Sequence, residues 1–256
     1  MNTCAKCFLV LILLAFSAYE SLSQTILQWN KQLNTAVHVD YMTDTEKEMV
    51  IELNKVRTDP EQYKILVLDE LKKTISDSTD LKSFTSYSIR KKVTVVEGIE
   101  HAEIDTIYNN YYLDRLTAIR DLLSDLDSIE PMQILKPHKN LYKAAKEHGN
   151  KEAHLGEINH QAQDGSWPWD RVEKAAPDIE FSKENIAMGG CTPAEIVMQL
   201  LIDSGVPGYG HRYNILNPNW EFVGCREVTE MEMECGYWIQ EFGKQHSKIA
   251  DHFSNK

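Results

Sequence analysis

The sequence has no excess of positive charge. Its 256 residues carry 27 Lys and Arg against 39 Asp and Glu, which gives a formal net charge of -12. A chain this acidic is repelled by nucleic-acid phosphates and by anionic lipid surfaces. The charge balance therefore excludes binding to either of them through bulk electrostatics, and we expect no nucleic-acid partner.

Long apolar runs are missing beyond the N-terminus. Residues 7–18 are apolar, follow a lysine, and are succeeded by the small residues Ser21 and Ser23. The run is too short to cross a bilayer comfortably and is typical of a signal peptide. We expect residues 1–23 to be cleaved and residues 24–40 to form a linker. The protein is then secreted, either extracellular or periplasmic, without a transmembrane span.

Cysteine is scarce, with five in the whole chain and only three beyond the predicted signal peptide. In an oxidising compartment such cysteines are candidates for disulfides. Cys225 and Cys235 stand in two adjacent predicted strands, close enough to face each other across a hairpin. We predict a bond between them, worth about 2–3 kcal/mol by loop closure; two reduced cysteines are the alternative. Cys191 is then expected to be a buried thiol rather than a nucleophile, since no activating base adjoins it.

Several enzyme signatures are also absent. The glycine-rich segment 205–210 lacks the Gly-Lys-Ser pattern of a phosphate-binding loop, and no His-Glu-x-x-His pair occurs. Internal repeats and low-complexity tracts are missing too. The length suits one good-sized core, or one domain with an insertion.

Local signals predict where the main helices begin. Thr43 followed by Glu46 can cap a helix that should end near Thr58, because a proline follows two residues later. Thr192 followed by Glu195 has the same capping arrangement and predicts a second helix.

Strands are expected at 184–188, 222–228 and 235–242, the last two as an antiparallel pair. Residues 67–132 are expected to be an insertion, with a helix that docks on the core through the apolar stripe between Ile104 and Leu126. Trp167 and Trp169, at the start of a short helix, are expected to pack in the fold rather than to form a ligand platform.

Three short motifs occur in a fixed order in the second half of the chain. They are Glu-Asn-Ile-Ala at 184–187, Gly-His-Arg at 210–212 and Asn-Ile-Leu at 214–216. Supporting pieces in the same order are Asn54, Arg57, His160 before Asp164 and Gly165, Arg171, the segment 222–224 and the segment 237–243. Together they resemble the CAP superfamily, also called the SCP or cysteine-rich secretory protein family, in its secreted bacterial form. The resemblance covers roughly residues 43–66 and 133–243.

The resemblance implies a fold and a range of partners. The fold is α+β, a three-layer α-β-α sandwich around a small antiparallel sheet, with a large open cleft. It would occupy residues 41–244, interrupted by a helical insertion at 67–132 and followed by a polar tail at 245–256. The ligands that the resemblance implies are a lipid, a glycan or a protein.

The resemblance also implies a site on the floor of the cleft, built from His160, Glu184, Asp203 and His211. Asp203 stands where many members of the family carry Glu. Two neutral imidazoles suit Zn²⁺, and nearby carboxylates balance its charge or fix the histidine tautomers. We therefore predict a weak zinc site at His160 and His211. A metal-free hydrogen-bonded cluster and a general base that activates water are the alternatives.

The function expected from these residues is binding rather than catalysis. A secreted binding protein is the first hypothesis. A metal-assisted hydrolase acting on peptides or cell-wall material is the alternative, although no Ser or Cys nucleophile lies in a recognisable motif. A third hypothesis is an adhesion or assembly domain whose insertion, residues 67–132, makes the contact.

Overall fold

The computed structural model describes residues 27–80, 85–96, 99–156, 158–229 and 235–246. Its contacts divide the chain into two units, Met1–Lys31 and Gln32–Lys256, and the second unit contains all the described α-helices and strands. The predicted signal peptide lies outside the described residues, as does most of the predicted polar tail. Part of the predicted linker packs within the second unit, where Leu33 and Ala36 are buried.

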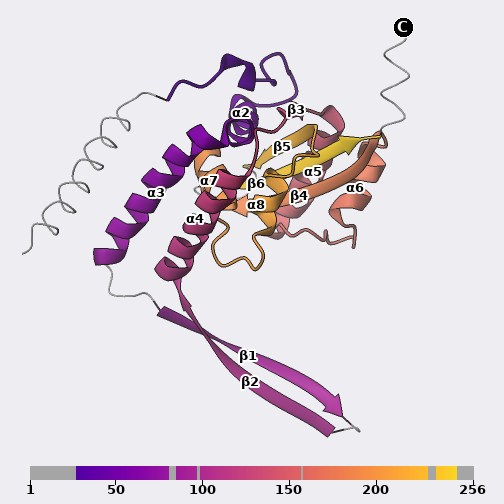
Figure 1. Ribbon diagram of the computed structural model, residues 1–256. Helices are drawn as coiled ribbons and strands as arrows, with labels where there is room; N and C mark the ends of the chain where they lie inside the picture. The colour runs from indigo at the N-terminus through magenta and orange to yellow at the C-terminus, as the bar shows by residue number, and fades with distance from the viewer. Residues whose placement is uncertain (1–26, 81–84, 97–98, 157, 230–234, 247–256) are drawn as a thin grey trace, which may run out of the picture. The chain divides into compact units, whose positions relative to one another are not determined.

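Helices and strands are interspersed along the chain (Figure 1). In order they are η1 Lys31–Leu33, α2 Asp44–Thr58, α3 Pro60–Asp80, β1 Thr85–Val96, β2 Ile99–Asn110, α4 Tyr111–Ser128, β3 Lys136–Pro137, α5 Lys139–Glu152, η2 Ala153–Leu155, α6 Pro168–Ala175, β4 Ile179–Met188, α7 Pro193–Ile202, α8 Gly210–Ile215, β5 Phe222–Val228 and β6 Tyr237–Gln245.

The predicted helix starts are confirmed. At the start of α2 the hydroxyl of Thr43 accepts from the backbone N–H of Glu46, whose carboxylate accepts in return from the backbone of Thr43. Thr192 and Glu195 form the same reciprocal pair at the start of α7. Each pair satisfies backbone donors that a helix leaves open at its first turn, so the boundary is fixed locally.

The central sheet has four strands in the order β3-β5-β6-β4. The strands β4, β5 and β6 pair antiparallel, and the two-residue β3 joins β5 in parallel. The two strands β4 and β3 are therefore the edges. β1 and β2 form a separate two-stranded antiparallel sheet.

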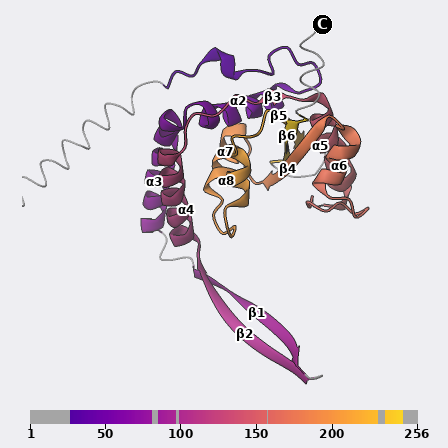
Figure 2. The ribbon, with the colours of Figure 1, turned by 45° about the vertical axis from the view of Figure 1, so that its right-hand side comes forward.

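Helices cover both faces of the four-stranded sheet (Figures 1 and 2). On one face α5 packs against β5 and β6, and α6 packs against β4; on the other, α2 contacts β5 while α7 and α8 contact β4. The alternation of side chains along the strands agrees with this arrangement. Gly224 faces α5, so the next residue, Cys225, faces the opposite layer. Gln240 pairs with Cys225 on that face and donates to Met49 of α2. The predicted three-layer α-β-α sandwich is confirmed.

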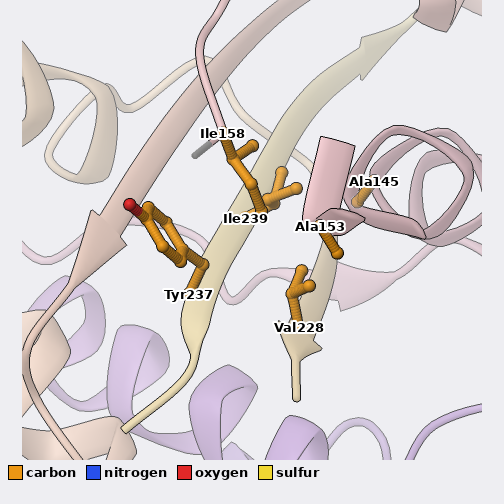
Figure 3. Close-up of a cluster of buried hydrophobic side chains, with 6 residues drawn as sticks. All are labelled: Ala145, Ala153, Ile158, Val228, Tyr237 and Ile239. Carbon is orange, nitrogen blue, oxygen red and sulfur yellow. The ribbon is translucent and has the colours of Figure 1, made fainter. Parts of the chain in front are cut away.

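Small apolar side chains join α5 to the sheet. Figure 3 shows one cluster, in which residues of α5, η2, β5, β6 and the loop after η2 meet: Ala145, Ala153, Ile158, Val228, Tyr237 and Ile239. Gly224 lets the helix approach closely, since a Cβ there would lie 2.2 Å from the backbone nitrogen of Tyr142. Burial of this face supplies the hydrophobic stabilisation of the layer.

The helix predicted along the stripe from Ile104 to Leu126 is only partly correct. Residues as far as Asn110 belong to β2, and α4 begins at Tyr111. Apolar residues of an alternating strand can fall on a helical stripe over a short window, which explains the error. The described part of α4 docks as expected, with Ala118, Ile119, Leu122 and Leu126 buried.

A buried arginine holds the loops around the sandwich. Arg57, at the end of α2, donates to the backbone carbonyls of Ile215, Asn217, Gln133 and Trp220. Burial lowers the pKa of Arg57 to about 10, so the guanidinium stays charged at neutral pH. The carbonyls thus receive the charge-assisted hydrogen bonds that a buried cation needs.

The disulfide predicted between Cys225 and Cys235 is wrong. Cys235 is bonded to Cys191, and Cys225 is a free, buried thiol whose pKa is raised well above its usual value by burial and by the charge of Glu46. The register explains this: Cys225 pairs with Gln240, whereas Cys235 precedes β6, beside the end of β4. Because Met188 pairs with Tyr237, the turns that carry Cys191 and Cys235 meet.

Candidate functional site

The four predicted site residues meet at β4, an edge strand of the sheet. Glu184 lies in β4 itself, and His160 comes from the loop between η2 and α6, in the layer on one face. Asp203 ends α7 and His211 lies in α8, both in the layer on the other face. The site is therefore assembled where the two helical layers approach each other across a strand.

Glu184 is buried and receives two charged or polar partners. Its Oε1 accepts from Nδ1 of His160 at 2.8 Å, and its Oε2 accepts from the guanidinium of Arg171 at 2.7 Å. Burial alone would raise the pKa of Glu184, but the hydrogen bond from His160 and the positive charge of Arg171 outweigh burial and hold the pKa below its usual value. Glu184 is thus a carboxylate at neutral pH.

Asp203 plays the same part for the second histidine. Its Oδ1 accepts from Nδ1 of His211 at 2.8 Å, and its Oδ2 accepts from the backbone N–H of His211 at 2.9 Å. Asp203 is the C-cap of α7 and adopts the left-handed conformation, with φ of 54°, which Asp tolerates better than most residues. Although Asp is shorter than the Glu that many family members carry here, Asp203 reaches His211 from the end of α7.

Both histidines are oriented in the same way. A carboxylate only accepts hydrogen bonds, so each Nδ1 must carry the proton that it donates. In the neutral ring this leaves the lone pair on Nε2, which is the arrangement found in metal-binding histidines. The ring centroids of His160 and His211 are 6.4 Å apart with an angle of 28° between the planes.

Glu241 adds a third carboxyl group that the sequence reasoning missed. It lies on β6 directly opposite Glu184 and is fully buried. Burial and the charge of Glu184 raise the pKa of Glu241 well above its usual value. Neither carboxyl oxygen of Glu241 has a hydrogen-bond partner among the described residues, and burial beside the ionised Glu184 favours the neutral form of Glu241. The buried pair therefore carries a single negative charge, on Glu184.

Polar contacts fix the two segments that carry the histidines. Nε2 of His148, a buried residue of α5, contacts the backbone carbonyl of Asn159 at 2.9 Å, and Arg171 donates to the carbonyl of His160. On the other side, Asn185 of β4 donates to the carbonyl of His211 and accepts from Asn214. The ring positions are thus set by both layers.

A hollow of about 430 Å³ opens beside His160, Glu184 and His211, and its wall includes Trp167 and Trp169. The expectation that these tryptophans pack inside the fold is wrong. Trp167 is 39% exposed and Trp169 is 54% exposed, and their rings stack on each other, with centroids 5.3 Å apart and planes 7° apart. A second hollow of about 650 Å³ also includes His211 in its lining, together with Tyr111, Cys191 and Asp203.

The other residues singled out in the sequence have structural contacts. Arg212 is buried and pairs with Asp125 of α4 at 2.8 Å. Asn54 donates to the carbonyls of Leu33 and Leu135. Within the described ranges, no group of three or more His, Cys, Asp or Glu side chains is arranged to hold a metal ion. No described helix has both the length and the apolar character needed to cross a membrane.

More than half of the chain matches a known protein family. The family model of the cysteine-rich secretory protein family, CAP, matches residues 113–242. The uncharacterized protein YkwD of Bacillus subtilis is 29% identical over 114 residues, which are 44% of this chain and only 40% of that relative.

Two solved structures match the chain at low identity. An outer surface protein of Borrelia burgdorferi is 19% identical, with 54% of this chain and 97% of that chain covered at a TM-score of 0.39. An extracellular protein containing a SCP domain, from Bacillus anthracis, is 13% identical, with 64% and 66% covered at a TM-score of 0.37. From the extent of the family match, the chain belongs to the CAP family.

Proposed function

We propose that the protein is a secreted binding module whose cleft holds a weakly bound divalent metal and takes a ligand beside it. The observation that carries the proposal is the matched orientation of His160 and His211, each with Nδ1 bonded to a buried carboxylate. Two imidazole nitrogens thereby remain available in one open hollow.

The donor set suits zinc better than calcium or magnesium. Imidazole nitrogen is a preferred ligand of Zn²⁺, whereas Ca²⁺ and Mg²⁺ require several oxygen ligands. Glu184 and Asp203 are already bonded to Arg171 and to the backbone of His211, so they support the histidines rather than replace them as ligands. With only His160 and His211 as ligands, the metal would bind weakly and supply Lewis acidity for contact with a ligand.

Secretion is supported by the bond between Cys191 and Cys235. Disulfides form and persist in oxidising compartments and are rare in the reducing cytosol. The acidic charge of the chain fits a soluble extracellular protein, since it disfavours adhesion to anionic surfaces.

Hydrolysis is the second hypothesis, and the geometry favours it less. A general base works best when its pKa lies near the working pH. The pKa of Glu184 is held low by His160 and Arg171 despite burial, so this carboxylate is a weak base. Binding therefore accounts for the arrangement with fewer assumptions than proton abstraction from water does.

The test is a titration of the purified protein with zinc, in which calorimetry measures binding and thermal unfolding measures the melting temperature. We expect zinc to bind and to raise the melting temperature of the wild type. His160→Ala and His211→Ala should each remove binding, whereas His154→Ala, an exposed histidine of η2, should not. Zinc binding that survives both site substitutions, or no binding by the wild type, would contradict the metal proposal.

A further inference from the structure

The aromatic pair beside the histidines is the strongest feature that the metal proposal leaves unexplained. Exposed tryptophan is costly, because its large apolar surface gains most from burial. Trp167 and Trp169 nevertheless keep 39% and 54% of their surface exposed, and both line the same hollow as His160 and His211. Two such side chains on one wall indicate a surface that is covered when a ligand binds.

The pair is held in place by the start of α6. Pro168 occupies the first helical turn, and the carboxylate of Asp170 accepts from the backbone N–H of Trp167 at 2.8 Å. Arg171 donates to the carbonyl of Ser166, just before the pair, and to Glu184 of the histidine site. The backbone that carries the two indoles is therefore held relative to the histidines, and a ligand would not have to order this segment on binding.

Polar groups are interspersed with apolar ones in the rest of the hollow. Ser182, Lys183 and Asn214 line it together with the two histidines, beside the apolar Pro168 and Val206. A lipid tail needs an enclosed cavity, so this open hollow with separated polar groups suits it poorly. A sugar ring matches it, because a pyranose has an apolar C–H face that stacks on indole and hydroxyl groups around its edge that form hydrogen bonds.

We propose that the Trp167–Trp169 pair and the polar wall of the cleft form a binding subsite for a neutral, β-1,4-linked glycan chain. Such chains are flat, since their ring substituents are equatorial, and the C–H face of one ring can stack on the outer face of the indole pair. The net charge of -12 disfavours an anionic polysaccharide. This inference rests on the proposal that the cleft is a binding site, and it adds the class of ligand.

The test uses hexamers of β-1,4-linked glucose and N-acetylglucosamine, titrated into the full protein and followed by tryptophan fluorescence and calorimetry. We expect binding of at least one hexamer, with the indole emission changed. Trp169→Ala should weaken it at least tenfold, and Trp167→Ala should weaken it as well. Tyr213→Ala is the matched control, because Tyr213 is an exposed aromatic, at 58%, that does not line the hollow.

The outcomes separate this inference from the metal proposal. Zinc binding is measured on the same variants, and the tryptophan substitutions should leave it intact. If zinc binds but neither hexamer does, or if hexamer binding is indifferent to both tryptophans, the glycan subsite is wrong while the metal site stands. Tryptophan-dependent binding to phosphatidylcholine vesicles without binding to either hexamer would also overturn it. If the hexamer binds and needs the tryptophans but zinc does not bind, the glycan subsite stands and the metal proposal fails.

Discussion

Glu241 of β6 and Glu184 of β4 are directly paired across the sheet, and burial together with the charge of Glu184 raises the pKa of Glu241 well above its usual value. Glu184 accepts hydrogen bonds from His160 and Arg171, so it is the ionised member of the pair. The carboxylate that orients the first histidine therefore lies beside a buried neutral acid. The protonation of this pair can be tested through the pH dependence of stability.

Replacing Glu241 with Gln should stabilise the protein at neutral pH. The raised pKa means that folded Glu241 keeps its proton as the pH rises above about 4.3, the ordinary pKa of Glu, whereas the unfolded chain loses it. Between these two pKa values the folded state binds more protons, so its stability falls as the pH rises. Gln has no proton to lose, so the substitution removes this penalty.

The measurement is urea unfolding of wild type and Glu241→Gln between pH 4 and pH 7.5. We expect the two proteins to have similar free energies of unfolding near pH 4, and that of the variant to exceed that of the wild type by at least about 1 kcal/mol at pH 7. Glu173→Gln, an exposed acid of α6, provides the control and should show no such trend. A constant difference at every pH would mean that Glu241 is not the group responsible.

Asp203→Asn should weaken zinc binding without unfolding the protein. The amide can no longer offer two ionised acceptors to His211, so the ring loses its fixed tautomer. Loss of such a supporting carboxylate typically costs about 10–100-fold in metal affinity. Calorimetry measures the affinity, and Asp164→Asn, an exposed acid elsewhere in the His160 loop, is the control. Equal affinity in the two variants would rule out this role for Asp203.

Removing the Cys191–Cys235 disulfide should lower the free energy of unfolding more than substituting the free Cys225 does. The Cys191–Cys235 bond closes a loop with a sequence separation of 44, for which loop closure predicts about 4 kcal/mol. Cys191→Ser and Cys235→Ser should each lower the free energy of unfolding and make it insensitive to reducing agent. Cys225→Ala, which alters only the free thiol, should remain sensitive. Peptide mapping under non-reducing conditions checks the pairing, and a peptide that links Cys225 would contradict it.

Gly224→Ala should be strongly destabilising, whereas Gly210→Ala should not. A methyl group at residue 224 would lie 2.2 Å from the backbone nitrogen of Tyr142, and backbone cannot move aside as a side chain can. The helix α5 would have to shift from the sheet, at a cost of about 3 kcal/mol or more. A Cβ at Gly210 meets nothing within 4 Å. Thermal unfolding of the two variants measures the contrast, and equal melting temperatures would contradict it.

The helix starts and the site residues could be predicted because their signals are local or occur in ordered motifs. Thr43 with Glu46, and Thr192 with Glu195, satisfy backbone donors within one turn, so the sequence window contains the whole interaction. The site residues lie in short segments whose order resembles a known family. The structure brings them together, while their role in binding stays a prediction.

The features that were missed depend on contacts between distant strands. The partner of Cys235 follows from the pairing of Met188 with Tyr237, which no local pattern reveals. The acid pair of Glu184 and Glu241 depends on the same register. Both acids stand near the middle of the observed strands β4 and β6, but the strand predicted at 184–188 begins at Glu184, so the pairing could not be read from the predicted elements.

The two histidines belong to opposite helical layers, and no continuous segment of the chain carries both with their carboxylates. A chain that has formed its helices but has not yet docked them on both faces of the sheet would consequently have no site. The proposed binding would therefore require that folding of both layers is complete.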